Sequence, residues 1–143
     1  MNKVWLGAGF AVAIAGAVWF WTSAGDAPVA SDPATDSTAI VSVKVPDTFS
    51  ASAEIGKSVY DAKCAACHAS GGVGQVDIAP PLVHVIYEPS HHGDESFQRA
   101  VANGVRAHHW KFGDMPPVEG LTRGEVTMIV AYIRELQRAN GIH

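Results

Sequence analysis

Cys64-Ala65-Ala66-Cys67-His68 is the stretch that decides the fold of this 143-residue chain. Two thiols three residues apart lie on the same side of a helical turn, and the next residue can direct its imidazole to that side. C-x-x-C-H is the attachment pattern of c-type haem, because a porphyrin offers two vinyl groups to the thiols and an iron atom to the imidazole. We therefore expect one covalently attached haem c, bonded to Cys64 and Cys67, with its iron ligated by His68.

Other uses of a cysteine pair fit this sequence less well. A disulfide within the motif would leave His68 without a role. A thioredoxin-like redox pair needs a β-α-β context, which the sequence does not offer. A zinc site needs further ligands, and there is no second cysteine pair. The remaining alternative is a chance occurrence of a five-residue pattern.

Composition excludes several classes of protein. Ten Lys and Arg against fourteen Asp and Glu give a net charge of −4, and no local basic stripe offsets it, so a nucleic-acid-binding protein is excluded. Only two cysteines are present, which excludes a multi-bridge disulfide framework and a four-cysteine zinc site. A domain this small buries little apolar surface, and a covalent cofactor would supply the missing core.

Residues 1–24 are expected to form an export or anchor segment. The run from Val4 to Trp21 is apolar, follows Lys3, and would span about 27 Å as a helix, close to the thickness of a hydrocarbon core. Tryptophans near both ends suit the two membrane interfaces. We expect a single-pass anchor in the inner membrane, with the following domain in the periplasm. The alternative is a signal peptide cleaved near Ala24, which would leave a soluble periplasmic protein.

Residues 25–51 are rich in Ala, Ser, Thr, Asp and Pro and have almost no apolar periodicity. This composition is typical of a flexible linker, and about thirty residues of flexible chain reach roughly 30 Å. The third region, residues 52–143, carries the cysteine motif. The expected domain organisation is therefore an anchor or signal segment, a linker and one globular domain.

Helical patterns account for most of residues 52–143, and no alternating apolar run indicates a sheet, so we predict an all-α domain of three or more helices around the haem. The first helix is expected over 53–66 and the second over 95–103, with Asp94 as a possible cap and Gly104 as the stop. The third starts at a capping box, Thr122 with Glu125, and ends at Asn140-Gly141. The long segment between the first two helices would wrap the cofactor.

Met115 is the predicted sixth iron ligand. It lies in Gly113-Asp114-Met115-Pro116-Pro117, where prolines stiffen the loop before the third helix. A thioether ligand closes the iron to other ligands and raises its reduction potential, which suits electron transfer. Met128 falls within the third helix and is expected to pack in the core. If Met115 is not the ligand, His108, His109 or a five-coordinate iron remain open.

The region from Ile55 to Leu136 resembles a bacterial, monohaem class I c-type cytochrome. Gly56-Lys57-Ser58-Val59-Tyr60 before Cys64 is similar to the family's first helix. Ala79-Pro80-Pro81-Leu82 is similar to the family's G-P-x-L segment, with alanine in place of glycine, and Ile129 to Ile133 around Tyr132 resembles its last helix.

This resemblance implies the roles of several residues. Gly56, Tyr60 and Tyr132 would form the contact at which the first and last helices cross. The carbonyl of Pro80 would accept the Nδ1 proton of His68, and Leu82 would pack on the haem face.

The resemblance also implies a function. It is that of a single-haem electron carrier with redox protein partners such as respiratory or photosynthetic complexes or periplasmic dehydrogenases. No catalytic constellation stands out in the sequence, so we do not expect an enzyme. The membrane would be contacted through the predicted N-terminal helix. The alternatives are a ligand-binding, peroxidatic or sensor haem protein with an open iron position, and a cytochrome subunit of a larger oxidoreductase.

Two histidine pairs, His91-His92 and His108-His109, are not explained by the resemblance. Imidazoles in such numbers can bind copper or zinc, but the sequence does not show that the pairs meet, and a polar rim around the haem is the simpler interpretation. Trp110 and Arg106 are candidate donors to the haem propionates.

Overall fold

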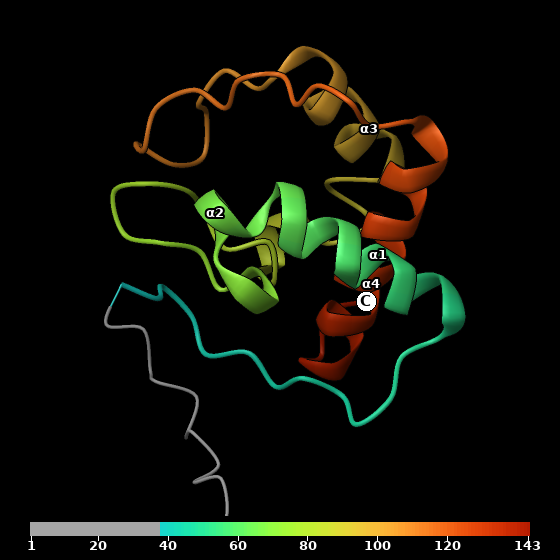
Figure 1. The fold of residues 1–143 in the computed structure, drawn as a ribbon. Helices are drawn as coiled ribbons and strands as arrows, with labels where there is room; N and C mark the ends of the chain where they lie inside the picture. Colours follow the sequence, from blue (N-terminus) through green and yellow to red (C-terminus); the bar gives the residue numbers. More distant parts are fainter. Residues whose placement is uncertain (1–37) are drawn as a thin grey trace, which may run out of the picture. The chain divides into compact units, whose positions relative to one another are not determined.

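The computed structural model describes residues 38–143, and this part of the chain consists of helices joined by loops (Figure 1). Extended segments pair only at isolated bridges, so no sheet forms within the described residues. The predicted all-α class is confirmed. In chain order the helices are α1 (Ala51–Lys63), α2 (Ala65–His68), the short 3₁₀ helices η1 (Ser70–Gly72) and η2 (Val85–Tyr87), α3 (Asp94–Asn103) and α4 (Arg123–Ala139).

Helices α1 and α4 cross at the centre of the domain (Figure 1). Gly56 allows their close approach, because a Cβ atom at this position would lie 1.8 Å from the carbonyl oxygen of Met128. Next to this crossing the rings of Tyr60 and Tyr132 pack with their centroids 5.4 Å apart. The predicted crossing contact is confirmed. The core around it is made of buried apolar residues, namely Ala53, Tyr60, Val83, Ile129, Tyr132, Ile133 and Leu136.

The predicted capping box starts α4. The Thr122 hydroxyl accepts a hydrogen bond from the Glu125 amide at 3.2 Å, and a Glu125 carboxylate oxygen accepts one from the Thr122 amide at 2.7 Å. These bonds satisfy two backbone donors that a helix start leaves unpaired. The helix ends at Ala139 with Asn140 as its cap, as predicted.

The first predicted helix differs from the observed one. Helix α1 ends at Lys63, and Cys64, with φ −117°, separates it from the short α2. After His68 the chain leaves the helix through Ala69, whose φ of 58° is unusual for a residue other than glycine. The Tyr60 hydroxyl donates a hydrogen bond to the Ala69 carbonyl at 2.9 Å and so holds this turn against α1.

Helix α3 also begins differently from the prediction. Asp94 is its first residue and not its cap, and the cap position belongs to Gly93, which has no side chain to offer. The Asp94 carboxylate instead accepts a hydrogen bond from Arg134 Nε at 2.9 Å, which ties α3 to α4. Gly104 ends the helix with φ 73°, as predicted.

Residues 38–50 correct the prediction of a flexible linker as far as residue 51. The amides of Ile40 and Val41 donate to the Val73 carbonyl at 3.2 Å, and the Asn140 side chain bonds both backbone groups of Lys44. Ser50 caps α1 and donates to Glu135 at 2.6 Å. These hydrogen bonds hold the segment to the domain, and amino-acid composition does not reveal them.

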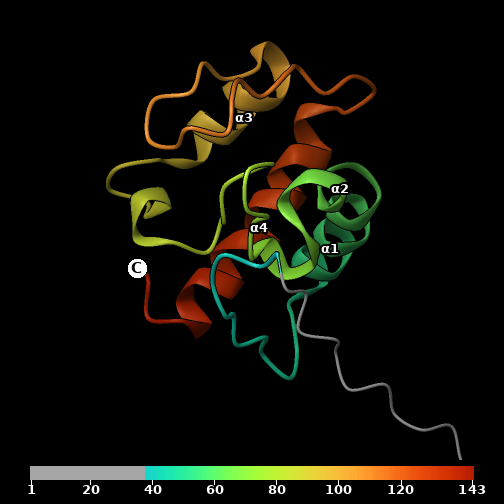
Figure 2. The ribbon, with the colours of Figure 1, turned by 90° about the vertical axis from the view of Figure 1, so that its left-hand side faces the viewer.

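Figures 1 and 2 place residues 38–50 (cyan) and the loop that follows α3 (orange) at opposite ends of the domain. The predicted anchor or signal segment, residues 1–24, and the first half of the predicted linker lie outside the described residues. Among residues 38–143, no helix has the length and apolar character that crossing a membrane requires.

Candidate haem site

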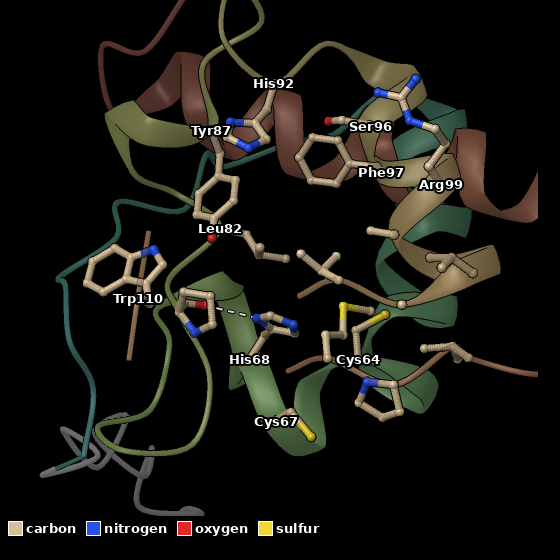
Figure 3. Close-up of a pocket in the computed structure, with 18 of the residues that line it drawn as sticks. Cys64, Cys67, His68, Leu82, Tyr87, His92, Ser96, Phe97, Arg99 and Trp110 are labelled. Carbon is tan, nitrogen blue, oxygen red and sulfur yellow. Dashed lines mark hydrogen bonds between the residues drawn. The ribbon is translucent and has the colours of Figure 1, made fainter. Parts of the chain in front are cut away.

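A cavity of about 610 Å³ lies among α1, α2, α3, α4 and the loop after α3 (Figure 3). Its size falls in the range of cofactor sites. All six residues that the sequence analysis assigns to haem binding line this cavity, namely Cys64, Cys67, His68, Pro80, Leu82 and Met115. They come from three separate segments of the chain, and folding brings them to one place.

His68 is held in the form that an iron ligand needs. The residue is only 8% exposed, and burial lowers the pKa of its imidazole, which favours the neutral ring. Its Nδ1 lies 2.9 Å from the carbonyl oxygen of Pro80, the contact that the resemblance implies (Figure 3). A carbonyl can only accept, so Nδ1 carries the proton and Nε2 keeps its lone pair for a metal.

The turn that carries Pro80 is fixed against α2 by close backbone packing. The Gly74 amide donates to the His68 carbonyl at 2.9 Å. A Cβ atom on Gly74 would lie 2.4 Å from the backbone nitrogen of Pro81, and Gly74 has φ 72°. The Leu82 amide donates to the Gly72 carbonyl at 2.8 Å. This part of the loop between α2 and α3 therefore positions both Pro80 and Leu82 on the cavity wall.

Neither cysteine forms a disulfide, and both line the cavity. Cys64 is half-buried, and burial, followed by the neighbouring Cys67, raises its pKa to about 11. A thiol with so high a pKa is protonated at neutral pH, whereas a thioredoxin-like pair needs a reactive thiolate. The burial of Cys64 therefore argues against thioredoxin-like disulfide exchange at this motif.

Met115 reaches the cavity on the loop between α3 and α4. Its amide and carbonyl pair with those of Val105, each at 2.9 Å, in an isolated bridge that closes the loop. Gly104 makes the bridge possible, because a Cβ atom there would lie 2.5 Å from the Met115 carbonyl oxygen. His108 and His109 lie within the same loop and also line the cavity. Met128, in contrast, is not among the lining residues.

Trp110 tests whether the cavity fits a haem. Among the described residues, its indole nitrogen is the one buried side-chain polar atom without a partner in hydrogen-bond geometry. Burial raises the pKa of the Tyr87 hydroxyl on the same cavity wall, and the Trp110 indole offsets this only in part. A buried hydrogen-bond donor without a partner is costly, so this nitrogen indicates that a bound group from outside the polypeptide accepts its hydrogen bond. A haem carboxylate would supply such an acceptor, so the residues fit the cofactor. Arg106 also lines the cavity.

Sequence reasoning missed Tyr87 and Phe97 as lining residues. Phe97 is placed by the sequence on the apolar face of α3, but that pattern does not say whether the face meets a helix or a cavity. Tyr87 belongs to η2, in a Pro- and Gly-rich stretch without periodicity. Figure 3 shows both rings along the wall of the pocket above His68.

Comparison with known proteins agrees with this geometry. A family model described as Cytochrome c matches residues 53–137. Neither the curated proteins nor the solved structures include a significant match. The matched region contains the cysteine motif, the methionine loop and the crossing of α1 with α4, all of which bound the cavity. This chain therefore belongs to the cytochrome c family and carries haem c, with its iron, in covalent attachment.

Proposed function

We propose that this cytochrome is a single-haem electron carrier and not an enzyme. Family membership supports haem-based electron transfer in general. The observation that carries the finer proposal is that His68 and Met115 line one apolar cavity, each on a separately braced segment. An iron ligated from both sides has no position left for a substrate. When bound, the haem supplies a one-electron couple between ferric and ferrous iron.

The chain's own residues have distinct tasks in this proposal. Cys64 and Cys67 hold the porphyrin through thioether bonds, and His68 ligates the iron with an imidazole oriented by Pro80. Met115 would supply the second protein ligand to the iron. The apolar lining, including Leu82, excludes water and so limits the reorganisation that electron transfer requires.

Electrons would enter and leave near the exposed rim of the site. Cys67 is exposed while Cys64 is half-buried and His68 is buried, so the thioether at Cys67 would be the part of the site nearest to solvent. Lys63 lines the cavity and Lys111 follows Trp110 in the loop, whereas Lys57 is paired with Asp61 at 2.7 Å. Because the chain has a net charge of −4 and Lys57 is already paired, we do not expect docking to redox partners to rely on a strongly basic patch. Respiratory or photosynthetic complexes and periplasmic dehydrogenases are the proposed partners.

The proposed location is the outer face of the inner membrane, with residues 1–24 as a single-pass anchor. The apolar run from Val4 to Trp21 supports it, and cleavage near Ala24 would instead give a soluble periplasmic carrier. Because residues 38–50 pack on the domain, the tether in this proposal shortens to residues 25–37. An anchored domain would then meet partners close to the membrane surface.

The absorption spectrum of the oxidised protein tests the proposal. Ligation by Met115 predicts a weak methionine–iron charge-transfer band near the red end of the visible range. Met115→Ala should remove this band and let the ferrous iron bind carbon monoxide. Met128→Leu is the matched control and should keep both the band and the resistance to carbon monoxide, since Met128 does not line the cavity.

Two results would contradict the proposal. A wild-type protein that lacks the band and binds carbon monoxide readily would favour a ligand-binding, peroxidatic or sensor haem protein. Co-purification of the native chain at fixed stoichiometry with an enzyme subunit would favour a cytochrome subunit of a larger oxidoreductase.

A further inference from the structure

Four histidines that are distant in sequence meet beside the haem cavity. His91 and His92 precede α3, and His108 and His109 lie in the loop that follows it. The His109 ring centroid is 5.2 Å from that of His91, 5.2 Å from that of His92 and 4.3 Å from that of His108. The two pairs flank α3 in sequence, and the fold brings them together at one edge of the molecule.

The nitrogen atoms in this cluster have the spacing of metal ligands. The Nε2 atoms of His91 and His109 are 3.3 Å apart, and one ring nitrogen of His92 completes a set of three that all lie within 4.8 Å of one another. Two imidazole nitrogens bound to one tetrahedral ion at about 2.0–2.1 Å lie roughly 3.3 Å from each other. The closest pair already matches that separation, and movement of the exposed His91 and His109 rings toward the nitrogen of His92 would complete the site.

Hydrogen bonds to backbone carbonyls orient two of the rings. His92 Nδ1 lies 2.6 Å from the Ile86 carbonyl oxygen, and His108 Nδ1 lies 2.8 Å from the Arg106 carbonyl oxygen. Each carbonyl can only accept, so both Nδ1 atoms carry the proton and both Nε2 lone pairs remain available. Metal-binding histidines in proteins have this second contact as a rule, because it fixes the tautomer and the ring direction.

His92 is also held through its backbone. Arg134, which is 7% exposed, donates to the carbonyls of His92 and Tyr87 and to the carboxylate of Asp94. This buried guanidinium anchors the turn before α3 to the centre of α4. The cluster therefore combines one rigid ring with two exposed rings that can adjust to an ion.

We propose that His91, His92 and His109 form a second metal site, distinct from the haem iron, for a divalent cation such as Cu²⁺ or Zn²⁺. The cluster offers only imidazole nitrogens, a donor set that suits Cu²⁺ and Zn²⁺ and disfavours Ca²⁺ and Mg²⁺, which take oxygen ligands. His108, in ring contact with His109, is placed to become a fourth ligand. The usual order of affinities puts Cu²⁺ ahead of Zn²⁺.

The position of the site gives it a consequence for the haem. His92, His108 and His109 line the haem cavity as well as the cluster, so a bound dication would add positive charge at the cavity edge. Positive charge disfavours ferric iron relative to ferrous iron, and we expect metal binding to raise the reduction potential. This consequence rests on the proposed electron-carrier function, whereas metal binding itself does not.

Calorimetric titration of the tag-free, ferric holoprotein with CuCl₂ and with ZnCl₂ tests the site. We expect one equivalent of either ion to bind, with Cu²⁺ bound more tightly. His91→Gln and His109→Gln, both at exposed positions, should each weaken binding at least about tenfold, since even a lost supporting hydrogen bond costs a metal site that much. The control His143→Gln, at the chain terminus, should leave the affinity unchanged.

Electron paramagnetic resonance of the Cu²⁺-loaded protein provides the second readout. Coupling to three or more nitrogens is expected in the wild type, and fewer in His109→Gln. Wild-type affinity in both His91→Gln and His109→Gln, or loss of binding only in His143→Gln, would overturn the proposal. A wild-type protein that lacks the methionine–iron band, and whose haem spectrum changes in metal-free His109→Gln, would also overturn it, because His109 would then ligate the haem iron.

Discussion

Gly56 and Met128 lie in backbone contact where α1 crosses α4, with only 1.8 Å between the Met128 carbonyl oxygen and the place a Cβ atom on Gly56 would occupy. Both helices contribute lining residues to the haem cavity, among them Tyr60 from α1 and Ile129 from α4, so this contact fixes how the two helices lie beside the cavity. The crossing is thus part of the site as well as of the core.

Gly56→Ala should force the two helices apart and lower the free energy of unfolding by at least about 2 kcal/mol, as overpacking of a well-filled contact does. Denaturant unfolding followed by circular dichroism measures the change. Gly124→Ala is the matched control, because it also lies in a helix and its added methyl would meet nothing closer than 3.8 Å. A Gly56→Ala variant as stable as the wild type would show that the helices can separate at no cost.

Cys64→Ser and Cys67→Ser should each remove one thioether bond, and the double variant should retain no covalent haem. Intact-mass measurement after maturation in an export-competent host reports the haem adduct directly, and also whether the chain is cut near Ala24. Ala66→Ser, an exposed change within the same motif, serves as the control and should keep the full adduct. A haem adduct that survives in the double variant would disprove attachment through these sulfurs.

Trp110→Phe should lower the reduction potential of the haem. Loss of the buried indole N–H would leave a haem carboxylate less compensated, and the extra negative charge would favour ferric iron. Redox titration with optical detection measures the effect. Phe112→Leu alters the ring that stacks on Trp110, with centroids 5.6 Å apart, but removes no donor, and it should shift the potential less. Equal shifts in the two variants would mean that packing, not the indole N–H, matters.

Glu125 should make the stability of the domain depend on pH in the acid range. Hydrogen bonds from the backbone and then the side chain of Thr122 lower the pKa of Glu125 below its usual 4.5. A carboxylate whose pKa is lower in the folded state adds stability above pH 4.5 and loses it as the pH falls through the folded value. Compared with Glu125→Gln, which still accepts hydrogen bonds, the wild type should lose more stability on acidification in urea titrations. Parallel curves for the two proteins would argue against the effect.

The parts of the fold that were predicted correctly from the sequence depend on interactions between neighbouring residues. The capping box of Thr122 and Glu125 and the stop at Gly104 depend on a few neighbouring residues, and both were predicted in the right place. The expected cap at Asp94 was wrong because Arg134, forty residues away, competes for its carboxylate. The packed segment at 38–50 was missed for the same reason, since its partners Val73, Glu135 and Asn140 are remote in sequence.

The sequence by itself determined the chemistry of this protein. Spacing within Cys64 to His68 predicts covalent haem attachment, the proline-stiffened loop predicts Met115 as a ligand, and the family pattern adds Pro80. The first two predictions depend on covalent reach and turn geometry among neighbouring residues. Only the tertiary structure decided which distant groups share a space. Three features depend on the packing of segments that are remote in sequence, so no local pattern predicts them. They are the place of Tyr87 in the cavity wall, the unpaired indole nitrogen of Trp110 and the contact of His91 with His109.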